Sequence, residues 1–200
     1  MNKNKLKLNE EKTELLVLGD RTCLCQVKKE PLTFGPNAVL FQTSAKYLGV
    51  HLDETLSMEE QVTSLCCSSY FHLHKIASIR PYLSDENTVQ LVSALILSRL
   101  DYCNSTLSGL PSCSLNRLQK VQNNAARLVL RKQKSDHTTP HLEKLHWLPV
   151  EARIHYKIAT LAFRHFENSL PPYLSELLHT YQPSRTLRSS SEKTVKNPQT

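Results

Sequence analysis

Short apolar runs separated by turn residues occupy the first 55 positions of the chain. The run at 12–18 stops at Gly19 and Asp20, which is typical of a buried strand closed by a turn. Gly35, Pro36 and Asn37 favour a turn between two further apolar segments. Other strands are predicted at 23–27, 32–34, 39–41 and 46–52. The pattern therefore predicts a small antiparallel sheet.

From position 57 the apolar spacing changes to that of helices. Ser57–Glu60 has the sequence of a capping box, in which the Ser hydroxyl accepts from a helical amide and the Glu reaches back. The helix that follows is expected to end near Pro81, and Ser84 is the predicted cap of a second helix that ends before Gly109. Further helices are expected at about 114–132, near 142–147, from Pro149 to Phe166, and over 173–181.

These patterns predict an α+β, mostly helical fold in three parts. Residues 1–55 hold the short strands, and residues 56–181 form a helical bundle that packs on them. Residues 182–200 are rich in Ser, Thr and Lys and have little to bury, so we expect a disordered tail there.

The composition narrows the class of protein. Hydrophobic residues make up 40% of the 200 positions and charged residues 22%, values that suit a globular protein with a real core. We expect no membrane partner, because no window approaches 18 consecutive apolar residues. Six cysteines without disulfide or zinc spacing indicate reduced thiols in a nuclear or cytoplasmic protein: Cys23, Cys25, Cys66, Cys67, Cys103 and Cys113.

Positive charge is concentrated in the second half of the chain. Residues 111–200 carry 14 Lys and Arg against 6 Asp and Glu, a net charge of +8, whereas residues 1–110 have a net charge of −1. The sharpest basic feature is the predicted helix near 114–134, which contains no acidic residue. Its candidate nucleic-acid-binding residues are Arg117, Lys120, Arg127, Arg131 and Lys132.

Two interpretations of this helix stay open. Cations interspersed with the amides of Gln119, Gln122, Asn123 and Asn124 suit contacts along a phosphate backbone. An ordinary amphipathic helix with a solvated basic face has the same composition. The absence of Asp or Glu at i, i+4 positions favours the first interpretation, because the usual stabilising pairs are missing.

Recognisable catalytic and metal-binding patterns are absent from the sequence. The chain contains no Gly-x-Ser-x-Gly elbow, no P-loop, no His-Glu-x-x-His and no Asp-Asp pair. The cysteines and histidines do not share helix faces at ligand spacing. We therefore expect no catalytic residue, no metal, no cofactor and no small-molecule substrate.

Ordered stretches of the sequence resemble motifs of reverse transcriptases from LINE-type non-LTR retrotransposons. Residues 6–14 (LKLNEEKTE) look like the LNxxKTE segment, and residues 46–53 (KYLGVHLD) are similar to KYLGVxLD. The later stretches are SRLDYCNS at 98–105, LQKVQNNAARLV at 118–129, DHTTP at 136–140 and LHWLPV at 145–150. An ordered set of this kind is hard to reach by chance.

The resemblance implies a position in the parent polymerase. Residues 1–55 correspond to the end of the palm, with Lys12 in a motif placed near the incoming nucleotide and Tyr47, Leu48 and Gly49 in a primer-grip-like turn. The helices correspond to the thumb and the region beyond it, which in the family holds template–primer duplex. In this chain we expect Lys12 to face solvent ahead of a strand.

The resemblance also bears on activity. The family's Tyr/Phe-Ala-Asp-Asp box is expected just upstream of Leu6, so this chain alone is expected to be inactive as a polymerase and to keep sequence-independent binding of RNA–DNA duplex. The alternatives are an activity completed in trans by a chain with the aspartates, a helical protein-interaction module, and a product of a decayed element without function.

Overall fold

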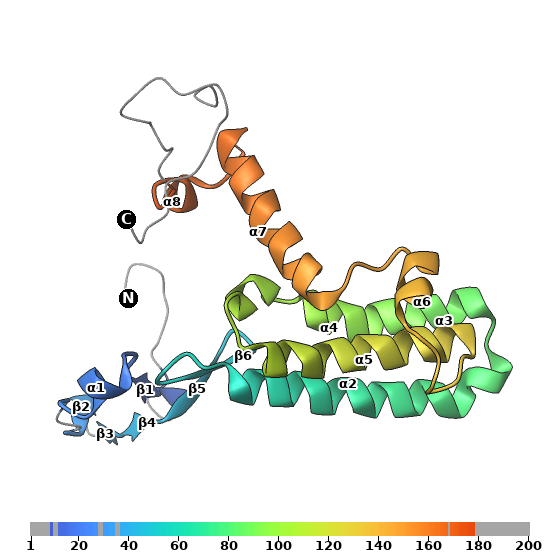
Figure 1. The fold of residues 1–200 in the computed structure, drawn as a ribbon. Coiled ribbons are helices and arrows are strands. Elements are labelled where there is room, and N and C mark those ends of the chain that lie inside the picture. Colours follow the sequence, from blue (N-terminus) through green and yellow to red (C-terminus); the bar gives the residue numbers. More distant parts are fainter. Residues whose placement is uncertain (1–8, 10–11, 28–29, 35–36, 168, 179–200) are drawn as a thin grey trace.

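The computed structural model confirms an α+β fold that is mostly helical (Figure 1). It describes residues 9, 12–27, 30–34, 37–167 and 169–178. The tail predicted at 182–200 lies outside the described residues, as do positions 35–36 of the predicted turn. The short strands lie at one end of the long helices (Figure 1).

The N-terminal strands pair two by two. β1 and β4 are parallel, whereas β2–β3 and β5–β6 are antiparallel. The bounds are β1 Leu15–Leu16, β2 Leu32–Phe34, β3 Asn37–Val39, β4 Phe41–Gln42, β5 Ser44–Tyr47 and β6 Val50–Asp53. Strands this short cannot form an extended sheet, so the described part holds three small ladders in place of the one sheet that was predicted.

Three strand predictions are wrong in detail. The predicted strand at 39–41 is divided, since β3 ends at Val39 and β4 begins at Phe41. The predicted strand at 23–27 overlaps helix α1 (Arg21–Leu24), which begins because the Asp20 carboxylate accepts from the Arg21 amide at 2.8 Å. The predicted strand at 46–52 is a hairpin, because Leu48 and Gly49 have φ of 47° and 85°. Positive φ at two successive residues makes the tight turn whose twist matches paired strands.

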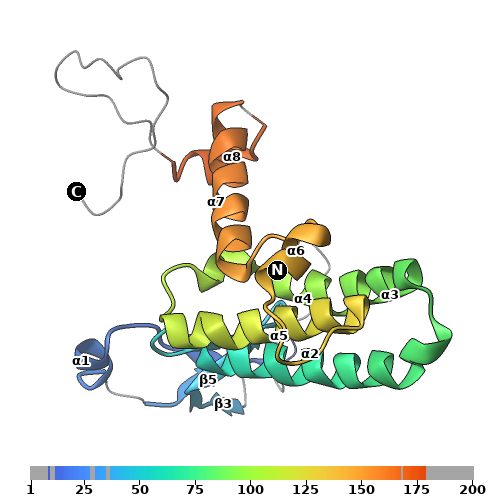
Figure 2. The same cartoon turned by 45° about the vertical axis from the view of Figure 1, so that its right-hand side comes forward.

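The helices form a bundle of three long rods. α2 (Glu59–Ile79) runs beside α5 (Ser112–Leu130), and the third rod is continuous from α3 through η4 to α4 (Figures 1 and 2). The remaining bounds are η3 Arg80–Tyr82, α3 Asp85–Val92, η4 Ser93–Leu97, α4 Ser98–Asp101, η5 Asn104–Leu107, α6 Thr139–Lys144, α7 Val150–Phe166 and α8 Pro172–Ser175. One apolar cluster runs through all three rods and gives the bundle its core.

The predicted N-terminal cap is correct for α3 and wrong for α2. The Ser84 cap is confirmed, since its hydroxyl accepts from the Asn87 amide at 3.2 Å. The capping box at Ser57–Glu60 is wrong: Met58 is the N-cap residue and makes no side-chain cap bond, and the Ser57 hydroxyl accepts only from the Glu59 amide, at 3.4 Å. Asp53 takes that role and accepts from the Met58 amide at 2.8 Å.

The apolar stripe of α7 meets the bundle only at its start. Val150 and Ile154 are buried, while Tyr156 and Phe163 are 66% and 63% exposed. Beyond Ile154 the helix leaves the three rods and projects away from them (Figure 2). Its outer apolar residues form a groove with α8, lined by Ile158, Leu161, Ala162, Leu170, Leu174, Leu177 and Leu178.

The pKa of Asp53 is lowered in the folded protein, so the contribution of this residue to the start of α2 can be tested by varying the pH. Burial opposes ionisation of Asp53, but hydrogen bonds from the amides of Ser57 and Met58 and the Thr55 hydroxyl outweigh it and lower the pKa to about 2. A depressed folded-state pKa stabilises the fold above pH 3.8, and that stabilisation is lost as pH falls toward 2.

We expect Asp53→Asn to lower the free energy of unfolding by about 1 kcal/mol at pH 7, a value reduced for solvent screening. The difference from the wild type is expected to shrink below pH 4, to be mostly lost at pH 2, where Asp53 is about half protonated, and to vanish only at still lower pH. Urea unfolding followed by circular dichroism at several pH values measures it. Asp20→Asn, which alters only the cap of α1, is the control. A difference that does not change with pH contradicts the assignment.

Candidate nucleic-acid interface

The predicted basic residues of α5 lie on one face of the helix. Arg117, Lys120, Arg127 and Arg131 are spaced by three, seven and four residues, which confines them to an arc of about 80°. Arg131 directly follows the helix end, with a φ of 51°, and Lys132 is the next residue. These five residues are called the α5 row here. From Arg117 to Arg131 the row extends about 21 Å along the helix axis.

The α5 row faces outward. Lys120 and Lys132 are exposed, and no carboxylate in the described part of the chain forms an ion pair with either. The side chains of Arg117 and Arg131 are 40% and 58% exposed. The row thus keeps unpaired positive charge at the surface.

Arg117 joins the beginning of α5 to the beginning of α2. Its Nη1 lies 2.9 Å from the Glu59 carboxylate, and its Nη2 donates to the Thr63 hydroxyl at 2.8 Å. Further along, the Asn124 amide donates to the Tyr70 hydroxyl of α2 at 3.3 Å. The contacts advance in the same direction on both helices, so α2 and α5 are parallel neighbours, as Figure 1 shows.

Arg127 is half-buried and anchors the loop that follows α5. Its Nη2 donates to the Asp136 carbonyl at 3.1 Å, and its Nη1 donates to Asn124 at 3.3 Å. Its Nε is buried and has no hydrogen-bond partner among the described residues. Part of this guanidinium therefore serves the fold, and we expect Arg127 to contribute less to a ligand contact than the lysines of the row.

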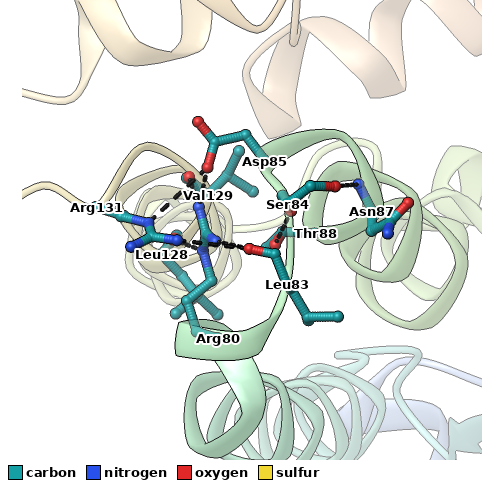
Figure 3. Close-up of polar contacts among 9 residues, drawn as sticks. All are labelled: Arg80, Leu83, Ser84, Asp85, Asn87, Thr88, Leu128, Val129 and Arg131. Atoms are coloured by element: carbon teal, nitrogen blue, oxygen red, sulfur yellow. Dashed lines mark hydrogen bonds and ion pairs between the residues drawn. The ribbon is translucent and has the colours of Figure 1, made fainter.

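A buried guanidinium, Arg80, holds the far end of the α5 row. Its Nε donates to the Leu128 carbonyl at 3.1 Å and its Nη2 to the Val129 carbonyl at 2.7 Å, the last carbonyls of α5 (Figure 3). Helix C-termini carry partial negative charge and leave carbonyls unpaired, so a cation is stabilising there. The sequence analysis missed Arg80, because its spacing beside Pro81 indicates only a helix end.

Arg80 also fixes the start of α3. Its Nη1 donates to the Leu83 carbonyl at 2.8 Å, and its Nη2 forms an ion pair with Asp85, the first residue of α3 (Figure 3). The hydrogen bond from Arg80 lowers the pKa of Asp85. Arg131 of the row lies 3.9 Å from the same carboxylate. The position of Arg131 therefore depends on the Arg80 contacts.

Two of the amides expected beside the cations point into the protein. Gln122 is fully buried and donates to the Leu148 carbonyl at 2.8 Å, and Gln119 accepts from the Val150 amide at 2.8 Å. They hold the connection to α7 on other sides of α5: measured from the middle of the row, Gln122 lies about 180° and Gln119 about 120° round the helix. The prediction that they line the phosphate-binding face with the cations is wrong; Asn124 alone has a side-chain contact at the row.

The family-motif residues lie apart from the α5 row. Lys12 is exposed just ahead of β1, as expected. Tyr47 and Leu48 are 66% and 73% exposed at the β5–β6 turn, and Gly49 completes it. The Tyr102 hydroxyl donates to the Leu48 carbonyl at 2.6 Å, which ties this turn to the end of α4.

The described residues also bear on metal binding, membrane spans and cysteine chemistry. No cluster of three His, Cys, Asp or Glu side chains there is suited to hold a metal ion. No described helix combines the length and apolar character of a membrane span. All six cysteines are free thiols, and burial raises the pKa of Cys66.

We expect Arg80→Met to lower the free energy of unfolding by about 2–4 kcal/mol, because the Leu128 and Val129 carbonyls lose this donor in a buried setting and the Leu83 carbonyl keeps only a longer bond of 3.5 Å from Arg131. Asp85→Asn is the matched control; it is expected to cost less, since the side chain of Asp85 is 72% exposed. Urea unfolding measures both variants. Equal effects would show that the exposed ion pair, and not the carbonyl contacts, supplies the stability.

Comparison with known proteins adds no assignment. No family model matches the chain, and neither the curated proteins nor the solved structures contain a match.

Proposed function

We propose that this chain is the end of the palm, the thumb and the region beyond it of a LINE-type retrotransposon reverse transcriptase, and that it binds RNA–DNA duplex without reading sequence. The ordered motif resemblance supports the origin. The observation that carries the binding is the α5 row, a set of cations gathered on one outward face of a helix fixed at both ends. We place this binding in the nucleus or the cytoplasm.

The dimensions of the α5 row suit a phosphate backbone. A row of about 21 Å has the length of about six base-pair steps at 3.4 Å along the duplex axis. Five cations face two carboxylates, Glu59 and Asp85, so the surface remains positive. Contacts to phosphates displace counterions and carry no sequence information, which makes affinity strongly dependent on salt.

The proposal assigns binding, and not phosphoryl transfer, to this face. Two-metal transfer needs carboxylates that converge on ions about 4 Å apart. The α5 row supplies guanidinium and ammonium groups only. The exposed β5–β6 turn at Tyr47–Gly49 is proposed as a second contact with the primer strand, on the basis of the resemblance and its exposure.

Removal of the two unpaired lysines of the row tests the proposal. We expect Lys120→Gln/Lys132→Gln to weaken binding to an RNA–DNA duplex and to reduce the slope of log K against log salt by about 2, one for each lost phosphate contact. Filter binding of the full chain at 50 and 200 mM salt measures both quantities, with duplexes of two unrelated sequences.

The matched control removes two exposed cations elsewhere. Arg21→Gln/Arg164→Gln changes the net charge equally, but these residues lie on α1 and on the outer part of α7, away from the row (Figure 1). The control is expected to keep the wild-type slope. Equal losses in the two double variants would indicate attraction by net charge alone. Absent binding, or binding indifferent to salt, would contradict the proposal.

A further inference from the structure

A polar pocket lies at the base of α7, on the side of α5 opposite the α5 row. It has a volume of about 330 Å³, near the lower end of the roughly 300–1,000 Å³ range of small-molecule sites. Besides Leu148, it is lined by Asp101, Asn104, His146, Arg153, Tyr156 and Lys157. These residues come from the end of α4, from η5, from the α6–α7 connection and from the first turns of α7.

One buried group in this pocket lacks a partner. The side chain of Asn104 belongs to a residue only 4% exposed, and its Oδ1 has no hydrogen-bond partner in the described structure. Buried acceptors are nearly always satisfied, because an unpaired one forfeits the hydrogen bonds that water would give it. Asn104 lines the pocket but its Oδ1 is itself shielded from solvent, so a ligand N–H or O–H group would satisfy this acceptor once the amide turns its oxygen toward the pocket.

The charges of the pocket favour an anion. Arg153 is largely engaged: its Nη1 lies 2.6 Å from the Asp101 carboxylate, and its Nε donates to the Leu148 carbonyl at 2.9 Å. The charges of Arg153 and Asp101 cancel, and the pair connects two sides of the pocket. Lys157 remains as an exposed cation, so the lining has a net charge of +1 with His146 neutral. A phosphodiester, with a charge of −1, matches that value, and the phosphomonoester of a free nucleotide, with about −1.5 to −2, exceeds it.

Tyr156 adds an aromatic surface. It lines the pocket and is 66% exposed, so one part of its ring is open to solvent. Nucleobases stack on exposed aromatic side chains without regard to base identity. Phosphate, an aromatic base and N–H or O–H donors occur together in a nucleotide.

We propose that this pocket binds one nucleotide unit, with the phosphate at Lys157, the base against Tyr156 and a base or ribose donor at Asn104. The unit comes either from a free nucleoside monophosphate or from an unpaired strand end. The site is separate from the α5 row, since Gln122, on the side of α5 away from the row, contacts the pocket wall at Leu148. The proposal for this pocket can therefore be tested separately from duplex binding.

Isothermal titration of the full chain with AMP tests the pocket. AMP is expected to bind saturably, whereas inorganic phosphate and adenosine each bind about tenfold more weakly, because each provides only part of the contacts. Lys157→Gln and Tyr156→Ala are each expected to weaken AMP binding by about tenfold. Arg164→Gln, another exposed cation of α7, is the matched control and is expected to bind AMP as the wild type does.

Competition distinguishes the two sources of the nucleotide. Bound AMP is challenged with a blunt RNA–DNA duplex and with one that has a three-nucleotide overhang. If only the overhang duplex displaces AMP, the pocket binds strand ends. If neither duplex displaces AMP, the pocket binds free nucleotide. The Lys120→Gln/Lys132→Gln variant is expected to bind AMP normally. Absence of AMP binding, or binding that Lys157→Gln leaves unchanged, overturns the pocket even where duplex binding persists.

Discussion

Four hydrogen bonds from the buried guanidinium of Arg80 hold the far ends of the three bundle rods together. The side chain leaves the end of α2, reaches the last carbonyls of α5 and contacts the first residue of α3. A planar guanidinium with five donors can satisfy several acceptors at once, which a lysine cannot. Because most acceptors here are carbonyls, the contact compensates helix ends that would otherwise be buried without partners.

The outward face of α5 follows from this arrangement. Arg80 holds the helix at Leu128 and Val129, and Arg117 holds its beginning through Glu59 and Thr63. With both ends held against α2, the rotation of α5 about its axis is set. The apolar residues then face the core, the glutamines face the base of α7, and the cations remain on the third side.

The same division gives the molecule two separate surfaces with different chemistry. The α5 row is an exposed basic surface on which Lys120 and Lys132 have no ion-pair partner among the described residues, which suits an extended polyanion. The pocket beneath α7 is concave, has a net charge of +1 and is lined by a residue with an unsatisfied acceptor, which suits a small anionic ligand with donors. Arg153 has a structural role at the second surface, like that of Arg117 at the first, since each joins two helices through a carboxylate.

Local patterns in the sequence were sufficient for the long helices, the Ser84 cap and the spacing of the cations on α5, because each depends on neighbours within a few residues; they did not find the short helix α1. They misassigned the start of α2, where Asp53 replaces the Ser57 box, and the roles of Gln119 and Gln122. Both errors involve partners from other elements. Packing alone brings Arg80 to the end of α5, 48 residues away, and gathers Asp101, His146 and Lys157 around one pocket. Contacts between residues so distant leave no periodic trace in the chain, because they depend on how the rods are placed in space and not on the spacing within any one of them.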